Sequence, residues 1–545
     1  MNASHDRKRS QYRTKMLKEH DLKFLDRENK RGRSEYWSDT GKNGVVVSAH
    51  YRATEAGATI LKKGGNAIDA AVAVSAALGV VEPAASGLGG MAMMNIHLAK
   101  ENRTFIIEGP CRAPIEATPD KVAAAPRKSG YKAAAVPTNP AVLAYALERY
   151  GTISASQVLE PAIALADDGY LMTPFQARVL GSYAGQLGKN NGADFFLNAQ
   201  RQPFHAKDRI FQPKLAATLK RLAEYGLEEF YLGQTGEEIL KDMKNHDGFL
   251  SNADFDPVPY PEEADTLCRN VLGWQVHTTP PPGGGISLLE MLLLFEELAM
   301  PEFTPNSPDA ALLFASIIRQ ARKDRINYRL ELTKDGKAIS EMLDPAYIQK
   351  ISALLVEETE YSGETTHFNV IDRWGNIVAC TQSIERSYGS KVVTPSLGFL
   401  YNGFMKGFKI ENKRHPHYLQ PGAVARSNAS PTLVMANEKT YAIGSTGSER
   451  MVSGLFETLV RLRCQNGFDA VRAPRLHCTP QGKVQYEPDR FSKAQLLALK
   501  NAGFVLAPYS DVWSFSAGGL HLACREKPRQ WAVADPRRDG AAFGW

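Results

Sequence analysis

The chain has 545 residues, of which 43% are hydrophobic and 23% charged, the composition of a globular protein with ample apolar material for a core. Its net charge is only +6 at pH 7, and residues 1–40 carry +4 of this, with 11 Lys or Arg and 7 Asp or Glu. We therefore interpret residues 1–43 as a basic, flexible amino-terminal arm, and we expect no nucleic-acid partner.

The same sequence argues against membrane proteins, metalloproteins and disulfide-rich proteins. The amino terminus lacks the apolar segment of a signal peptide, and no stretch supplies the roughly 20 clean apolar residues of a membrane span. The six cysteines include no CxxC pair, which argues against a zinc site and against a disulfide framework. We expect no membrane partner, no metal or other cofactor, and a cytoplasmic location.

Regular elements follow the arm in an order that mixes strands and helices. Residues 44–50 are a short apolar run typical of a buried strand, and residues 54–63 have a helical pattern that ends at two glycines. Asn66 is placed to cap an Ala-rich helix over residues 67–79, and residues 105–108 predict a strand. Further helices are expected at residues 140–150, 154–166, 215–225, 237–245, 286–300 and 309–328.

The pattern changes at Thr365. Residues 352–364 are acidic and end in EETEYSGE, and we interpret them as an exposed tether. Residues 366–372 and 377–384 read as two strands around the turn RWGN, which predicts a hairpin. Later strands are expected at 430–435 and 440–443, and a helix at 451–465. This mixture predicts a layered α/β or α+β protein.

Thr365 has the features of a nucleophile that is activated by its own amino group. A threonine hydroxyl attacks poorly unless a base removes its proton, and one solution makes the threonine an amino terminus whose α-amine is that base. The amine has a pKa of roughly 7.7–8.0, so a usable fraction is neutral near pH 7–8. This chemistry requires cleavage between Glu364 and Thr365. A threonine at the start of a strand is by itself also common for purely structural reasons.

Motifs along most of the chain accompany this threonine. They stand in the order GGNAIDAAVA (64–73), LGVVEPAASGLGG (78–90), YGTISASQVLEPAIALADDGY (150–170), PPPGGG (280–285), TTHFNVIDRWGNIVACT (365–381), SPT (430–432), GSTGSER (444–450) and APRLH (473–477). In these motifs and in their order, residues 44–545 resemble the γ-glutamyltransferase (glutathione hydrolase) family of N-terminal-nucleophile hydrolases.

The resemblance implies an α+β fold, the αββα sandwich in which two antiparallel sheets lie between helical layers. It also implies autocatalytic cleavage between Glu364 and Thr365. The folded part of the large subunit would span residues 44–364 and the small subunit residues 365–545. Both subunits of the precursor would contribute to one core, and each would be the other's partner.

The resemblance also assigns the catalytic roles. Thr365 matches the nucleophile, and Ser383 falls where the family has a threonine hydroxyl that supports it. Gly447 and Ser448 match the paired glycines whose backbone N–H groups form the oxyanion hole. A serine can keep that role because the donors are backbone groups. An ordinary Gly/Ser turn is the alternative reading of residues 444–450.

The resemblance is weakest in the pocket for a γ-glutamyl group. The family's carboxylate-binding arginine is absent from its position, with Arg112 two residues away, and Glu385 stands in place of the amine-binding asparagine. Phe404 replaces a polar residue of the ammonium site, whereas Ser427 remains, next to Asn428. We expect these five residues to line the substrate pocket. A substrate ammonium buried there without its usual acceptors would cost several kcal/mol.

These features favour an autoprocessing amidohydrolase that hydrolyses a small acyl amide or dicarboxylic monoamide, including oxamate-like compounds. A γ-glutamyltransferase or glutathione hydrolase is the alternative that the family itself favours. An uncleaved, non-catalytic scaffold is an alternative of another class. A nucleotide-binding protein is disfavoured because residues 87–90 (GLGG) precede a strand instead of opening a helix. The sequence leaves a higher oligomer open.

Overall fold

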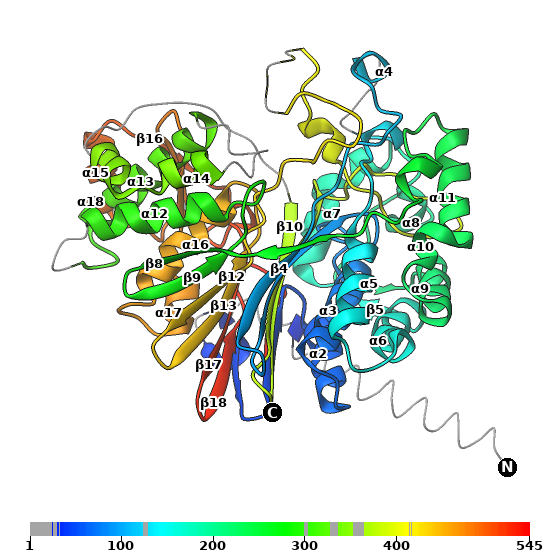
Figure 1. Cartoon of the computed structure of the whole chain (residues 1–545), viewed down its shortest axis with the longest axis horizontal. Helices are drawn as coiled ribbons and strands as arrows, with labels where there is room; N and C mark the ends of the chain where they lie inside the picture. Colours follow the sequence, from blue (N-terminus) through cyan, green and yellow to red (C-terminus); the bar gives the residue numbers. More distant parts are fainter. Residues whose placement is uncertain are drawn as a thin grey trace.

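The computed structural model describes residues 24–25, 30–31, 33–123, 129–298, 303–327, 336–352, 364–411, 413, 415 and 417–545. Its centre consists of two seven-stranded sheets that lie face to face, with helices on both outer sides (Figure 1). Every strand pairing within these two sheets is antiparallel. The expected αββα sandwich is therefore confirmed.

The first sheet holds the strand that begins at the expected nucleophile. In order across the sheet, its strands are β19 (Ala541–Gly544), β2 (Gly44–Ser48), β10 (Glu364–Asp372), β11 (Ile377–Glu385), β3 (Met91–Leu98), β4 (Arg103–Gly109) and β7 (Glu262–Asp265). The strand β10 is central, with β2 on one side and β11 on the other. Segments from before and after residue 365 thus contribute strands to one sheet.

The second sheet mixes the two parts of the chain in the same way. Its strands in order are β1 (Ser38–Gly41), β18 (Arg529–Val533), β17 (Leu520–Glu526), β13 (Lys439–Ser445), β12 (Thr432–Ala436), β9 (Trp274–Thr278) and β8 (Leu267–Val271). A small sheet of β14 (Leu476–Cys478), β15 (Lys483–Tyr486) and β16 (Val505–Pro508) and a two-stranded sheet of β5 (Tyr170–Leu171) and β6 (Arg209–Ile210) lie outside the sandwich.

Side-chain alternation along the strands separates three apolar layers. On β2, Val45 and Val47 pack between the sheets, whereas Val46 packs under the helices of the first layer. The helices over the first sheet are α2 (Tyr51–Lys62), α3 (Ala67–Val81), α5 (Asn139–Tyr150), α6 (Ala155–Asp167), α9 (Pro213–Tyr225) and α11 (Gln234–Asn245). Those over the second sheet are α12 (Gly285–Leu298), α13 (Pro308–Asn327), α16 (Arg450–Arg461) and α18 (Lys493–Asn501).

Two local sequence features, a helix cap and small side chains, explain how α2 and α3 form and pack in the first helical layer. Asn66 caps α3, because its side chain accepts hydrogen bonds from the N–H groups of Ile68 and Asp69 while the Asp69 carboxylate accepts from the N–H of Asn66. Small residues let α2 and α3 approach closely, and a Cβ at Gly57 would lie 2.5 Å from Val74. The strands and helices expected from the sequence are present, and in the described residues their ends differ from the expected ones by at most four residues.

The boundary expected for the amino-terminal arm is wrong. Residues 34–43 belong to the folded protein, since β1 pairs with β18 at the edge of the second sheet and Trp37 is only 2% exposed. The N–H groups of Lys42 and Asn43 also donate to the carbonyl oxygen of Trp545, at 2.9 and 2.8 Å. The local excess of charge concealed this pairing with the far end of the chain. Most of residues 1–33, and residues 353–363 of the expected tether, lie outside the described part.

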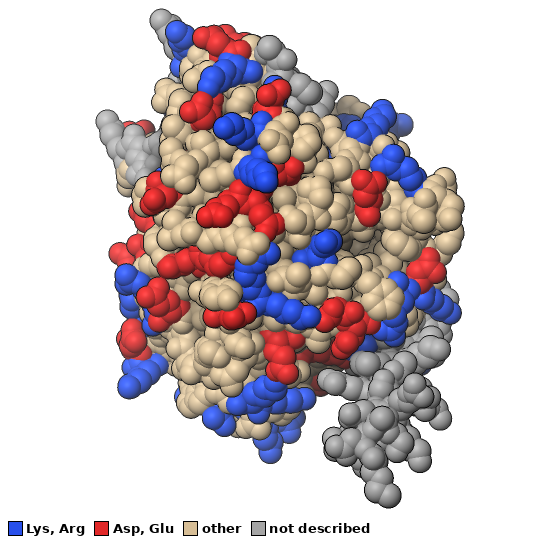
Figure 2. Space-filling view, turned by 90° about the vertical axis from the view of Figure 1, so that its right-hand side faces the viewer, with Lys and Arg blue, Asp and Glu red and all other residues tan. Residues whose placement is uncertain are grey.

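The outer face of the first helical layer carries acidic and basic side chains intermixed (Figure 2). Ion pairs such as Lys220 with Asp167, at 2.6 Å, join neighbouring helices there and are exposed, so each contributes little to stability. Among the helices that the structure describes, none combines the length and apolarity needed to cross a bilayer.

Candidate active site

The hairpin of β10 and β11 places the expected nucleophile beside its expected supporting hydroxyl. Thr365 Oγ1 donates to Ser383 Oγ at 3.3 Å, and the two residues are 5% and 4% exposed. The register shifts between Glu364 and Thr366, so that Ser383 and Ile384 of β11 lie opposite the single residue Thr365. Such a bulge re-aims side chains at the end of a ladder. The N–H of Glu385 donates to Ser383 Oγ at 2.9 Å and fixes that hydroxyl.

Thr381 shares a face of β11 with Ser383 but has a different task. Its hydroxyl lies 2.9 Å from His367 Nδ1, and His367 Nε2 lies 3.0 Å from the side-chain oxygen of Asn369. The Asn369 amide in turn donates to the carbonyl oxygen of His521 on the other sheet, at 2.9 Å. Burial lowers the pKa of His367 to about 3, so its ring stays neutral and joins the two sheets.

Thr365 and Ser383 open into a cavity of about 450 Å³. Of the residues expected from the sequence, Glu385, Phe404, Ser427, Asn428 and Ser448 also line it. Arg112 does not, because its side chain is exposed and its backbone bridges Val136 and Val424. The residues of this cavity that the sequence did not single out are Met91, Arg322, Ile326, Lys406, Gly407, Lys409, His415, His417, Arg426, Ala429, Glu449 and Met451.

The turn between β13 and α16 carries the two expected oxyanion donors. Gly447 has φ +99° and Ser448 has φ +57°, a left-handed conformation that is uncommon for serine and found often at functional sites. In the described parts of the chain, neither the N–H of Gly447 nor that of Ser448 donates a hydrogen bond. Of the two residues, Ser448 lines the cavity and Gly447 is buried next to it in the chain.

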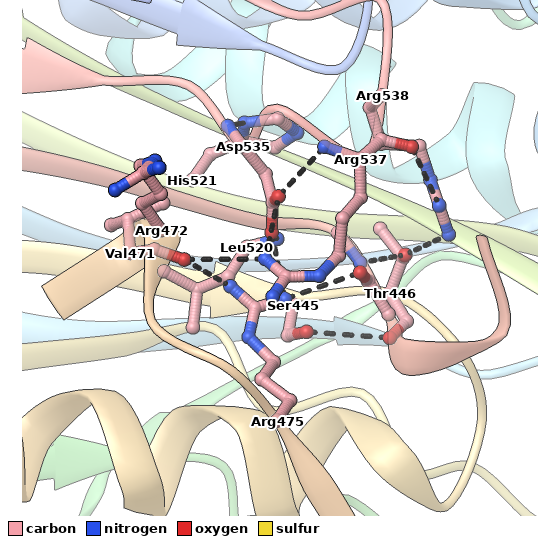
Figure 3. Close-up of polar contacts among 12 residues, drawn as sticks. Ser445, Thr446, Val471, Arg472, Arg475, Leu520, His521, Asp535, Arg537 and Arg538 are labelled. Carbon is pink, nitrogen blue, oxygen red and sulfur yellow. Dashed lines mark hydrogen bonds and ion pairs between the residues drawn. The ribbon is translucent and has the colours of Figure 1, made fainter. Parts of the chain in front are cut away.

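A buried cluster of charged residues anchors this turn through Thr446 (Figure 3). The Thr446 hydroxyl accepts from Arg538 Nη2 and from the N–H of Gly519, both at 2.7 Å. Arg475 Nη1 lies 2.7 Å from Asp535 Oδ2 and donates to the carbonyl oxygen of Gly518 at 3.1 Å. Burial opposes ionisation of Asp535, but the charges of Arg475 and its other arginine neighbour, Arg537, hold the pKa of that carboxyl well below its usual range.

The cavity wall is predominantly cationic. Arg322, Lys406, Lys409 and Arg426 line it against two acidic residues, Glu385 and Glu449. Glu449 Oε1 is shared by Arg322 Nη2 at 2.5 Å and Arg426 Nη2 at 2.8 Å.

Glu385 contributes less negative charge than its type suggests. Burial raises its pKa to about 7, although Lys406 and other cations oppose this shift. In the described region, Glu385 Oε2 and Asn428 Oδ1 are buried without a hydrogen-bond partner. At neutral pH the wall thus carries excess positive charge, which suits a small anionic ligand, whereas its two unsatisfied acceptors would suit a hydrogen-bond donor.

The sequence model of gamma-glutamyltranspeptidase matches residues 53–545 of the chain. The chain belongs to the gamma-glutamyltranspeptidase family. It is therefore an enzyme, an N-terminal-nucleophile hydrolase, and the resemblance drawn from its motifs is confirmed.

Relatives of this family member include hydrolases and acylases. It is 30% identical to a glutathione hydrolase proenzyme of Bacillus subtilis (strain 168), over 93% of this chain and 92% of the relative. It is also 30% identical to an acylase ACY 1 proenzyme of Pseudomonas sp. (strain V22), over 86% and 88%. Among solved structures, a cephalosporin acylase from Bacillus halodurans superposes with a TM-score of 0.84 at 25% identity, over 93% of this chain and 97% of the other.

The newly found lining residues of this family member left weak signals in its sequence. Arg322 lies within a helix expected from periodicity alone, and periodicity does not show which residues of a helix face a cavity made by other segments. Glu449 lies inside the GSTGSER motif, directly after Ser448, and was the accessible clue. Lys406 lies in a short 3-10 helix (Phe404–Gly407), and Lys409 and Arg426 lie in irregular segments, where no sequence pattern predicts the direction of a side chain.

Proposed function

We propose that this chain is an autoprocessing amidohydrolase whose Thr365 forms an acyl-enzyme that water hydrolyses. Cleavage between Glu364 and Thr365 would divide the 545 residues into subunits of 364 and 181 residues. In the uncleaved chain described here, both residues lie within β10. The observation that carries the proposal is the Thr365 hydroxyl, held 3.3 Å from Ser383 Oγ at the edge of a cationic cavity.

The chemistry follows from the groups at that hairpin. Once cleavage frees the α-amine of Thr365, the amine takes the proton of the threonine hydroxyl as the oxygen attacks the substrate's amide carbonyl. The amine of the substrate leaves with a proton, and the acyl group remains on Thr365 as an ester. Water then attacks the ester, releasing a carboxylic acid and restoring the hydroxyl. Ser383 orients the Thr365 oxygen through the contact that the structure describes.

The turn at residues 447–448 would stabilise the oxyanion formed in each attack. Its two N–H groups have no described acceptor, and Ser448 lines the cavity that Thr365 also lines. Preorganised donors of this kind typically account for about 2.7–4 kcal/mol of barrier each. This supports Gly447 and Ser448 as the oxyanion hole and disfavours an ordinary turn.

The walls favour a small dicarboxylic monoamide, including oxamate-like compounds, over a γ-glutamyl amide. A substrate carboxylate would meet the four Lys and Arg side chains of the cavity, whereas an α-ammonium would be repelled by them. Phe404 presents an apolar ring, only 6% exposed, where the family has a polar residue.

γ-Glutamyl hydrolysis is the second candidate, because Glu385 Oε2 and Asn428 Oδ1 are unsatisfied acceptors in the cavity. The name of the Bacillus subtilis relative, glutathione hydrolase proenzyme, points the same way. The two candidates differ in whether the acyl group carries an ammonium.

Intact-mass analysis of the purified protein tests the proposal directly. We expect two chains that correspond to residues 1–364 and 365–545, with acyl adducts on the smaller one after brief exposure to succinyl, glutaryl, oxalyl and γ-glutamyl anilides. Thr365→Ala should remain one inactive chain, whereas Thr366→Ala serves as the neighbouring control that still matures. A single unbroken chain with full amidase activity would refute the mechanism, and a single inactive chain would support a scaffold.

A further inference from the structure

Two arginines and one glutamate form a distinct cluster in the cavity wall. Arg322 belongs to α13, Glu449 follows Ser448 in the proposed oxyanion turn, and Arg426 lies in the segment between Phe408 and Ser427. Both guanidinium groups contact the same carboxylate oxygen, Glu449 Oε1. On the basis of the proposed function, we infer that Arg322 and Arg426, held by Glu449, bind the free carboxylate of a short dicarboxylic acyl group.

The charge of the three side chains is the first reason to expect a carboxylate ligand at this cluster. Two guanidinium groups face one carboxylate, so the cluster carries a net charge of +1 in a wall where Glu449 is 2% and Arg322 is 4% exposed. Charge removed from water in this way is costly unless a counter-charge and hydrogen bonds compensate it. Arg322 Nε is buried and has no hydrogen-bond partner in the described parts of the chain. Both arginines line the cavity, so a carboxylate bound there would face two guanidinium groups that can donate charge-assisted hydrogen bonds.

The fixed position of the two arginines is the second reason to expect that this cluster binds a carboxylate. Arg325, one turn after Arg322 on α13, donates to the carbonyl oxygens of Pro282, Gly283 and Ser427 at 3.0, 3.2 and 2.8 Å. Residues three apart share a helix face, so this anchor also fixes the direction of Arg322. Glu449 holds both guanidinium groups at one point. Because these guanidinium groups are already ordered, substrate binding loses little side-chain entropy.

Position in the site sets the class of acyl group. Glu449 is bonded directly to Ser448, whose N–H is a proposed oxyanion donor, so the carboxylate would bind close to the reacting carbonyl. This favours a short chain of the succinyl or glutaryl size. Arg322 lies before the proposed cleavage point and Arg426 and Glu449 after it, so both subunits complete the specificity site. Arg112, which the sequence suggested for this task, is exposed outside the cavity.

Removing each guanidinium in turn tests the inference. The processed Arg322→Met and Arg426→Met enzymes would be compared with wild type on glutaryl p-nitroanilide and on the matched substrate whose tail carboxylate is a primary amide. We expect each substitution to lower kcat/KM for the anionic substrate about 10- to 100-fold, as loss of one charge-assisted hydrogen bond implies. The value for the neutral substrate should change less than about threefold, since it makes no ion pair there.

Arg319→Met is the matched control, because Arg319 lies on the same helix but donates to the carbonyl oxygen of Pro480 and does not line the cavity. It should leave both substrates unchanged. Equal losses for the two substrates, or a wild-type enzyme without preference for the anionic one, would overturn the inference. The proposed function would stand in that case, provided that Thr365 is acylated.

If the variants fail to mature, inhibition of the wild-type enzyme tests the same inference. Free glutarate should inhibit competitively, and the neutral diamide of the same length should not. Equal inhibition by both compounds, or inhibition by neither, would contradict the carboxylate site. Failure of the wild-type chain to cleave itself or to hydrolyse any amide would instead refute the proposed function.

Discussion

Thr446 connects the buried charged cluster to the proposed oxyanion turn, and Thr446→Val removes this connection while keeping the shape of the side chain. The hydroxyl accepts one hydrogen bond from the charged Arg538 and one from the N–H of Gly519. Their loss should lower the free energy of unfolding by about 2–4 kcal/mol, the sum expected for one charged and one neutral hydrogen bond. The backbone bond from Thr446 N–H to Gly519, at 3.0 Å, remains and limits the damage.

The larger consequence is for the rate. Ser448 follows Thr446 by two residues, so a released turn displaces the oxyanion donors by a fraction of an ångström. Full loss of one donor costs roughly 100- to 1000-fold in kcat, and a displacement of about 1 Å costs roughly 100-fold. We therefore expect kcat to fall about 10- to 100-fold, with KM changed less than about twofold because the donors act mainly in the transition state.

Steady-state kinetics on fully processed protein, confirmed by denaturing gel, measure this effect. Thr446→Ser keeps the hydroxyl and should retain kcat within about threefold of wild type. Thr218→Val removes another fully buried threonine hydroxyl, which donates to Leu397 in the first helical layer, and should lower stability without changing kcat. If Thr446→Val matches Thr218→Val in kcat, or if its loss is entirely in KM, the turn does not depend on this anchor.

Three further predictions follow from other contacts. Ser383→Ala should slow both the appearance of the two subunits and kcat by about 10- to 100-fold, because Thr365 loses its 3.3 Å partner, and Ser383→Thr should restore both rates in the same gel and kinetic assays. The carboxyl of Glu385, with a pKa near 7, is neutral below that pH and anionic above it, so KM for a dicarboxylic monoamide should rise above pH 7 in wild type. A pH series with Glu385→Gln should give a flat KM, and an unchanged rise would exclude Glu385 as the titrating group. Trp37→Ala should lower the free energy of unfolding in urea by about 3–5 kcal/mol, whereas an unaltered midpoint would mean that residues 34–43 are not part of the core.

The sequence is sufficient to predict those parts of the site that are formed by residues close together in the chain. The hairpin of residues 366–372 and 377–384 could be predicted because alternation, a turn and a second strand follow one another directly. The position of Ser383 beside Thr365 then follows from pairing, although the bulge that aligns them could not be seen in the pattern. Thr365 itself became a specific prediction only through the motifs that accompany it.

The features that could not be predicted from the sequence depend on contacts between residues far apart in the chain. Arg322 and Glu449 are separated by 127 residues, and neither has a local pattern that points to the other. Arg112 is two residues from the position of the family's arginine, but this shift in an irregular segment leaves its side chain exposed. Residues 34–43 resemble an arm in the sequence because the segments that they pair with, β18 and Trp545, lie at the opposite end of the chain.

The central place of β10 explains how the chain could be cut at the nucleophile and keep its site. Residues 366–371 pair with β11 and residues 368–372 with β2, so the strand is held on both sides without the peptide bond before Thr365. The register shift sets Thr365 opposite two residues of β11, and its hydroxyl donates there to Ser383. Arg322 and Arg325 are held by ion pairs and carbonyl contacts that cross the proposed cut. Cleavage would therefore create two new chain termini, at Glu364 and Thr365, and leave the proposed specificity site in place.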